Sequence, residues 1–361
     1  MSETLGIIGA GAFGTALADV VARAGATVWI DTADEADARA INESHTHEKR
    51  LPGATLSSRV RATASVAEVA ANARLLVLAV TSRKAREVIR ELAGVVDGRH
   101  AIVHAIGALV EDDATPDQGP GPGSAAPGSH PHERAERASA NLIEERVRVS
   151  ELIHSETAVR RIGAMAGPAL AFDLIERRPA ALIVASPFDE VVAQAQKVLS
   201  APPALRVYGS SDLAGAELAA ALAGAFTLGV GLADGLDVGP GPRALFLTRA
   251  LAEGSRLTAL AGGEARTMTG LAGLGNVLAR SSPGTSDRSD DYQLGLAIGR
   301  GAPVAGAKQS EGARTLPALL RLAERRGARM PILRALQAAV HEGLPIDKVI
   351  GKLLETHAEV E

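Results

Sequence analysis

Apolar and polar residues follow two different patterns along the chain, and the change falls near residue 210. Before it, short apolar runs typical of buried parallel strands alternate with segments of helical periodicity, and after it the periodicity is helical throughout. The predicted strands are residues 5–8, 26–30, 73–80, 101–105, 163–166, 180–185 and 205–208, and the predicted late helices are residues 217–233, 244–260, 312–326, 331–341 and 346–357. The pattern therefore predicts an α/β fold, with a doubly wound, mostly parallel sheet followed by an all-helical C-terminal domain.

The first predicted strand runs into three glycines with the spacing G-x-G-x-x-G, namely Gly9, Gly11 and Gly14. In a Rossmann-type dinucleotide-binding unit the first permits a tight turn, the second lets the backbone approach a pyrophosphate, and the third lets the next helix pack closely. That helix offers free N–H groups and a positive dipole end to the phosphates. Asp31 closes the second strand, at the place where such units put an acid for the adenosine ribose hydroxyls. Since an acid there repels a 2′-phosphate, we expect NAD to be preferred over NADP.

The length of 361 residues suits two domains. We expect a dinucleotide-binding domain over residues 1–209 and a helical substrate and dimerisation domain over residues 210–361. Residues 115–131 are rich in Gly and Pro and cannot bury enough apolar surface to offset the entropy of ordering. We therefore predict a disordered insertion at about residues 112–133.

The composition excludes several classes of function. A net charge of −4 gives no general attraction to nucleic acid, and the absence of cysteine excludes disulfides, thiolate catalysis and Cys-ligated metal. His45 and His47 lack the acidic partners of a metal site, so we expect no metal. The chain begins without a basic leader, and no apolar run reaches about 18 residues without Gly or charge. We expect a cytoplasmic protein without a membrane span.

Further landmarks occur in a fixed order along nearly the whole chain. They are Phe13 and Thr15 in the glycine loop, Trp29, residues 41–45 with Arg50-Leu51-Pro52-Gly53, Gly167-Pro168-Ala169-Leu170-Ala171, Gly215-Ala216-Glu217-Leu218, residues 231–236, residues 248–253, residues 270–275, Glu311-Gly312 and Met330-Pro331-Ile332. Taken together, these segments resemble the bacterial type of NAD(P)-dependent glycerol-3-phosphate dehydrogenase.

The resemblance implies a homodimer that converts sn-glycerol 3-phosphate to dihydroxyacetone phosphate and so supplies phospholipid precursors. Its partner would be a small phosphorylated polyol or ketone. The resemblance adds Phe13, Ala171 and Glu311 to the cofactor-binding residues, and assigns Gly167 and Arg288 to the substrate.

The polar positions that this family uses for chemistry are changed in this chain. The catalytic lysine position is Ala223, followed by Gly224 in place of Asn, and the second lysine position is Ile106. The remaining departures are Asn276 for an aspartate, Arg280 for a threonine, Ser289 for the asparagine after Arg288, and Ala169 for a serine.

Oxidation of a secondary alcohol requires a group that moves the hydroxyl proton, and alanine cannot do this. Chain positions between Lys197 and Lys308 contain no lysine, which leaves Lys84 and His104 as weak stand-ins. We therefore name no catalytic residue. Two functions stay open: a dehydrogenase of a phosphorylated three-carbon polyol, slow or re-equipped for a related substrate, and a non-catalytic NAD-binding homologue with a regulatory or structural role.

Overall fold

The computed structural model describes residues 3–110, 148–282, 289–304 and 310–343. Its sheet has eight strands in the order β3-β2-β1-β4-β5-β6-β7-β8. All neighbouring strands are parallel except β6 and β7, which are antiparallel. The strands are β1 (Thr4–Ile8), β2 (Thr27–Asp31), β3 (Val60–Thr63), β4 (Leu75–Leu78), β5 (Ala101–His104), β6 (Arg161–Ala166), β7 (Ala180–Ala185) and β8 (Leu205–Ser210).

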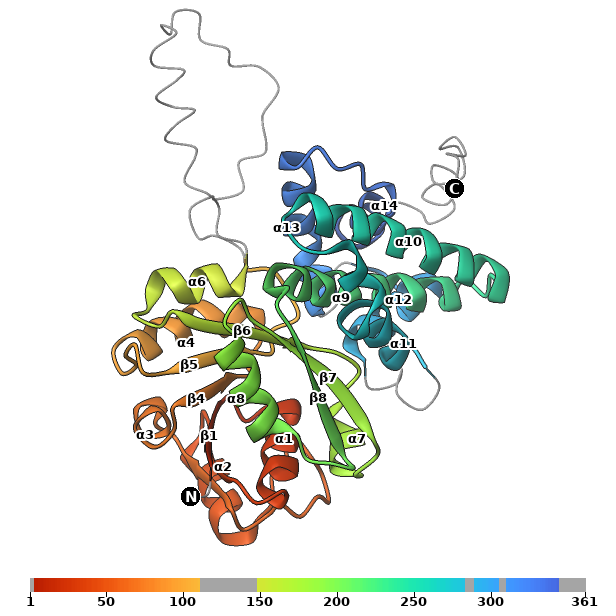
Figure 1. Cartoon of the computed structure of the whole chain (residues 1–361). Coiled ribbons are helices and arrows are strands. Elements are labelled where there is room, and N and C mark those ends of the chain that lie inside the picture. The colour runs from red at the N-terminus through yellow and green to blue at the C-terminus, as the bar shows by residue number, and fades with distance from the viewer. Residues whose placement is uncertain (1–2, 111–147, 283–288, 305–309, 344–361) are drawn as a thin grey trace, which may run out of the picture.

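Helices cover the sheet and then form a separate domain, which lies at one end of the sheet (Figure 1). The helices of the sheet domain are α1 (Ala12–Arg23), α2 (Glu35–Arg39), α3 (Val66–Asn72), α4 (Ser82–Ala93), α6 (Val149–Glu156), α7 (Ala171–Ile175) and α8 (Asp189–Leu199). Those of the helical domain are α9 (Leu213–Gly235), α10 (Pro240–Leu260), α11 (Asn276–Arg280), α12 (Asp290–Gly299), α13 (Glu311–Arg325) and α14 (Pro331–His341). Short η helices are η1 (Ala40–Ser44), η2 (Ala265–Thr269) and η3 (Leu271–Gly275).

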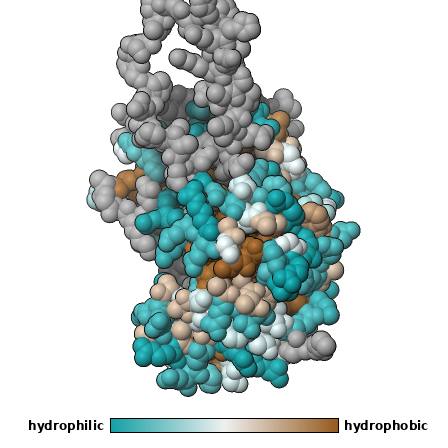
Figure 2. All heavy atoms as spheres, turned by 90° about the vertical axis from the view of Figure 1, so that its left-hand side faces the viewer, coloured by the Kyte–Doolittle hydropathy of each residue, from teal (hydrophilic) through white to brown (hydrophobic). Residues whose placement is uncertain are grey.

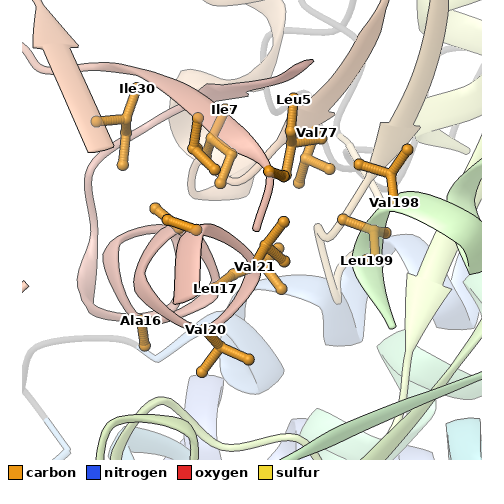
Figure 3. Packing of buried hydrophobic residues seen from close by; sticks show 14 of the residues in the cluster. Leu5, Ile7, Ala16, Leu17, Val20, Val21, Ile30, Val77, Val198 and Leu199 are labelled. Carbon is orange, nitrogen blue, oxygen red and sulfur yellow. The ribbon is translucent and has the colours of Figure 1, made fainter. Parts of the chain in front are cut away.

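Apolar side chains of the sheet and of α1 form the core beneath the glycine loop. Ile7 and Ile30 on neighbouring strands lie over Leu17 and Val21 of α1, and all four are fully buried (Figure 3). The opposite face of the sheet is covered by α3, α4 and α6, whose inner residues form a second apolar cluster. Seen from the side that α3 and α4 occupy, the exterior is mostly hydrophilic with a smaller hydrophobic area near the middle (Figure 2). Burial of both faces explains why the central strands β1, β4 and β5 read as continuous apolar runs.

The helical domain is built around α9. The side chain of Asp212 caps this helix by accepting a hydrogen bond from the N–H of Gly215 (2.9 Å). By length and composition α9 could cross a membrane, but 94% of its apolar window is buried inside the fold, as expected for a central core helix. Helix α12 packs closely on it because Gly231 and Gly295 leave no side chain between the two backbones.

The structure confirms the predicted fold class, a Rossmann-type sheet domain followed by helices. Strand β3 was not predicted, because it is a short edge strand with an exposed arginine and little apolar pattern. The charged pattern of residues 33–43 predicts one helix, and the structure has α2 followed by the single π-turn η1 there. The predicted insertion at 112–133 and the predicted helix at 346–357 lie outside the described residues.

Candidate functional site

The three glycines occupy positions that only glycine tolerates, or that leave room for a ligand. Gly9 has φ of +110°, and a Cβ added there would lie 2.6 Å from the carbonyl oxygen of Ala79. A Cβ at Gly14 would lie 2.2 Å from the carbonyl oxygen of Gly9. A Cβ at Gly11, by contrast, would meet no atom within 4 Å. Gly11 therefore borders open space at the N-terminus of α1, where a pyrophosphate can approach the backbone, and the loop fits a dinucleotide.

Two apolar residues assigned to the cofactor lie close to this loop. Phe13 in the first turn of α1 is partly buried against the main apolar cluster, and Ala171 packs against the same cluster. Ala171 begins α7, which packs on α1. Both residues are thus placed beside the glycine loop, on the side of the sheet that α1 covers.

Asp31 ends β2 beside Ile8, at the carboxyl edge of the sheet. Burial raises the pKa of this carboxyl to about 6; the negative charge of Glu91 raises it further, and the positive charge of Lys84 opposes them. Lys84 and Glu91 both belong to α4 and are exposed. The charge of Lys84 therefore acts on the ribose side of the candidate cofactor site.

The first turn of α13 meets the carboxyl edge of the sheet. The Oε2 atom of Glu311 accepts a hydrogen bond from the N–H of Ser82, the first residue of α4 (3.4 Å). Its Oε1 accepts one from Arg314 (2.9 Å), and the hydroxyl of Thr315 accepts one from the N–H of Leu109 (3.0 Å). Glu311, which the resemblance assigns to the cofactor, thus sits at the junction of the two domains.

His104 lies at the carboxyl end of β5 and pairs with Glu217 of α9, with 3.0 Å between Nε2 and Oε1. The backbone N–H of Ser150 donates to Oε1 of Glu217 (2.8 Å), and the Ser150 hydroxyl donates to Oε2 (2.6 Å). Burial alone would raise the pKa of Glu217. The hydrogen bond and the charge of His104 and the two hydrogen bonds from Ser150 lower it by more, so the pKa of Glu217 is lowered. The carboxylate therefore stays ionised and joins β5, α6 and α9.

Sequence analysis did not find the roles of Glu217 and Ser150 in this cluster. A signal was present, because Glu217 is the only charged residue of α9 before Asp234. A carboxylate on an otherwise apolar, buried helix needs a partner, and His104 provides it. The imidazole is 1% exposed, and its Nδ1 has no hydrogen-bond partner among the described residues.

Three of the positions that the resemblance gives to polar groups are filled by buried apolar side chains. Ala223 is fully buried, Ile106 is 4% exposed and Ala169 is 7% exposed. Next to Ala223, a Cβ on Gly224 would lie 3.2 Å from the Cα of Gly312. The backbone of α13 therefore occupies the space beside the former lysine position.

Arg280 and Asp291 form an ion pair close to the same point. The Nη2 atom of Arg280 lies 2.7 Å from Oδ2 of Asp291, and the N–H of Gly312 donates to Oδ1 of Asp291 (2.7 Å). Sequence analysis did not single out Asp291. Gly167 keeps its turn, with φ of +142° and a hypothetical Cβ 2.9 Å from the Cα of Leu182, while Arg288 lies outside the described residues.

The described residues contain no group of three or more His, Asp, Glu or Cys side chains that could hold a metal ion. The glycine loop, the acid at the end of β2 and the sheet order together define a two-domain dinucleotide-binding protein of the Rossmann class.

Comparison with known proteins identifies the family. Models of the N-terminal and C-terminal domains of NAD-dependent glycerol-3-phosphate dehydrogenase match residues 4–115 and 212–351. A glycerol-3-phosphate dehydrogenase [NAD(P)+] of Streptomyces coelicolor is 34% identical over 98% of this chain and 97% of its own length. A second, from Sphingopyxis alaskensis, is 32% identical over 92% of this chain and 91% of its own length. The chain belongs to the NAD-dependent glycerol-3-phosphate dehydrogenase family.

A solved structure supports the same fold. The glycerol-3-phosphate dehydrogenase of Coxiella burnetii superposes with a TM-score of 0.81 and 24% identity, covering 98% of this chain and 99% of that one. This chain therefore shares its fold with that dehydrogenase over nearly its whole length.

Proposed function

We propose that this protein binds NAD and does not oxidise glycerol 3-phosphate at the rate of an ordinary dehydrogenase. Relatives at 34% and 32% identity carry the name glycerol-3-phosphate dehydrogenase. In this proposal the chain keeps the residues that bind the cofactor and lacks the lysine that moves a proton during hydride transfer. We also propose the division into residues 1–209 and 210–361, a cytoplasmic location and a homodimer.

The cofactor half is supported by the open space at Gly11 and by the carboxylate of Asp31. NAD, when bound, supplies a nicotinamide that accepts a hydride. In this chain the glycine loop and the first turn of α1 would hold the pyrophosphate, and Asp31 would accept hydrogen bonds from both ribose hydroxyls. An ionised Asp31 repels a 2′-phosphate, which supports a preference for NAD over NADP.

The burial of Ala223 supports the proposal that dehydrogenase activity is low. General acid–base help is worth about 10²- to 10⁴-fold in rate, and an alanine supplies none. Ala223 is fully buried, and a Cβ on Gly224 would lie 3.2 Å from the Cα of Gly312, so the backbone of α13 packs beside this position. Arginine is a poor substitute for lysine since it stays protonated at neutral pH.

The second candidate function is that of an oxidoreductase with a proton-transfer group other than the family's lysine. The His104–Glu217 pair is the observation that favours it. A carboxylate that holds one imidazole nitrogen leaves the other free to carry a proton, as in many acid–base pairs. Here, however, the imidazole is 1% exposed and the pair joins three elements of the core. We therefore assign His104 a structural role.

Cofactor binding is tested with a pair of glycine variants. Gly11→Val places a side chain in open space that the proposal gives to the pyrophosphate, so it should leave the melting temperature of the free protein unchanged and abolish the stabilisation by NAD. Gly98→Val is the matched control, because a Cβ there also meets nothing within 4 Å and the residue precedes β5 at the opposite edge of the sheet. Equal stabilisation of both variants by NAD would refute the site, and equal stabilisation of the wild type by NAD and NADP would refute the role of Asp31.

A further inference from the structure

The Arg280–Asp291 ion pair lies where four helices of the helical domain meet. Arg280 ends α11 and Asp291 is in the first turn of α12. Asp291 is 1% exposed and is held by the N–H of Gly312 at the start of α13, while the Arg280 side chain is 26% exposed. A Cβ on Gly224 of α9 would lie 3.4 Å from Oδ2 of Asp291.

The pair also lies near positions that the family resemblance gives to the chemistry, and near the Gly167 turn that it gives to the substrate. Asn276 stands one turn before Arg280 on α11, on the same face of the helix. A Cβ added to Gly275, the residue before Asn276, would lie 3.6 Å from Cδ of Pro168 in the Gly167 turn. On the other side, Gly224 follows the lysine position. Arg280, whose Nη2 contacts Asp291, therefore lies near positions that the family resemblance gives to the chemistry.

We propose that Arg280 is an anion-binding side chain whose anion position is filled internally by the carboxylate of Asp291. The contact is an ion pair, because Oδ2 of Asp291 accepts no aligned hydrogen bond among the described residues. A guanidinium attracts carboxylates and phosphates alike, through its charge and its planar N–H donors. The hydrogen bond from Gly312 fixes the carboxylate of Asp291, so no further conformational entropy is lost when it pairs with Arg280. It therefore competes with any external anion at a very high effective concentration.

The pair has no net charge, so it offers little attraction to a phosphate dianion. A phosphate ester would have to displace a buried carboxylate and leave it without its cation, which is strongly unfavourable. The inference deepens the proposed function, on which it rests: the internal ion pair keeps Arg280 from binding a phosphorylated substrate, in a site that also lacks the proton-transfer lysine. Any ligand admitted beside Arg280 in the wild-type protein is expected to be uncharged.

Asp291→Asn tests the inference in the full-length protein. The asparagine oxygen can still accept the hydrogen bond from Gly312, while the negative charge beside Arg280 is removed. The probes are inorganic phosphate and glycerol 3-phosphate, with binding measured by titration calorimetry at constant ionic strength. We expect the variant to bind both about 10- to 100-fold more tightly than the wild type, the range expected for one charged hydrogen bond.

Asp234→Asn is the matched control. Asp234 forms an analogous ion pair with Arg243 (2.9 Å) in the same domain, at the C-terminal end of α9, so this variant also frees one arginine. The Tyr292 hydroxyl donates to Oδ2 of Asp234 (2.8 Å), and an asparagine can still provide one oxygen that accepts a hydrogen bond. The Asp234→Asn variant should gain no affinity for glycerol 3-phosphate. The double variant Asp291→Asn/Arg280→Gln should lose the gain while melting as a folded protein, which separates anion binding from a general change in charge.

The outcomes separate this inference from the proposed function. Equal anion affinity in the wild type and in the Asp291→Asn and Asp234→Asn variants, all folded by circular dichroism, would overturn the internal-anion inference even if the wild type is inactive. Tight binding of glycerol 3-phosphate by the wild type would overturn it as well. Normal turnover of glycerol 3-phosphate by the wild type would overturn the proposed function.

Discussion

Glu253 gives the protein a pH-dependent stability whose size follows from its surroundings. The side chain is 4% exposed on α10, and its Oε1 accepts a hydrogen bond from the N–H of Ile332 in the first turn of α14 (2.8 Å). Its Oε2 is buried and has no hydrogen-bond partner among the described residues. Burial raises the pKa of this carboxyl from 4.5 to about 7, against the opposing effects of the α14 backbone N–H groups and of Arg256 and Arg249.

The sign follows from linkage. Because the pKa is higher in the folded than in the unfolded protein, the folded state favours the protonated acid, and stability is lost as the pH rises from 4.5 through 7. At about 1.4 kcal/mol per pKa unit, the full loss above pH 7 is about 3 kcal/mol. The protonated acid is mimicked by glutamine, so Glu253→Gln should remove this dependence.

The assay is urea unfolding of the wild type and of Glu253→Gln between pH 5 and pH 8. The free energy of unfolding of Glu253→Gln minus that of the wild type should increase by about 2 to 3 kcal/mol between pH 5 and pH 8. Glu324→Gln is the control, since Glu324 is 57% exposed and its surface ion pair with Arg334 is worth little. A difference between wild type and Glu253→Gln that changes by less than about 0.5 kcal/mol from pH 5 to pH 8 would refute the reasoning.

Three further predictions concern the site. The pKa of about 6 at Asp31 predicts that NAD affinity falls, and that the preference over NADP narrows, as the pH drops from 8 to 5; an affinity ratio that is constant with pH contradicts this. His104→Ala should lower the free energy of unfolding by about 3–5 kcal/mol, because it leaves the buried carboxylate of Glu217 without its partner; a loss below about 1 kcal/mol in urea unfolding contradicts the structural role. Ala223→Lys should be destabilising at a fully buried position and should restore little dehydrogenase activity, because Ile106, Gly224 and Asn276 leave the lysine without partners; recovery of an ordinary turnover number contradicts this.

Local features of the sequence were sufficient to predict the strand–turn–helix–strand unit that carries the glycine loop and Asp31. Gly9, Gly11, Gly14 and Asp31 lie within one strand–turn–helix–strand unit, where spacing alone fixes their relative positions. The apolar runs likewise predicted the central strands, because strands buried on both faces have no polar alternation to obscure them.

Contacts between residues far apart in the sequence could not be predicted in this way. His104 and Glu217 are 113 positions apart, and nothing in the local pattern of either residue specifies the other. Arg280 and Asp291 are nearer, but only the packing of α12 and α13 on α9 brings the carboxylate to the arginine. The burial of Ala223 is also a tertiary property, since an alanine in an apolar helix is equally compatible with an open cleft.

The central claim is tested most directly by the steady-state rate of NADH formation from glycerol 3-phosphate with NAD, and of the reverse reaction from dihydroxyacetone phosphate, using purified wild-type protein already shown to bind NAD. The account predicts a turnover number several orders of magnitude below the ordinary enzyme range of about 1–10³ s⁻¹. A turnover number within that range would contradict it and would return His104 and Lys84 to consideration as proton-transfer groups.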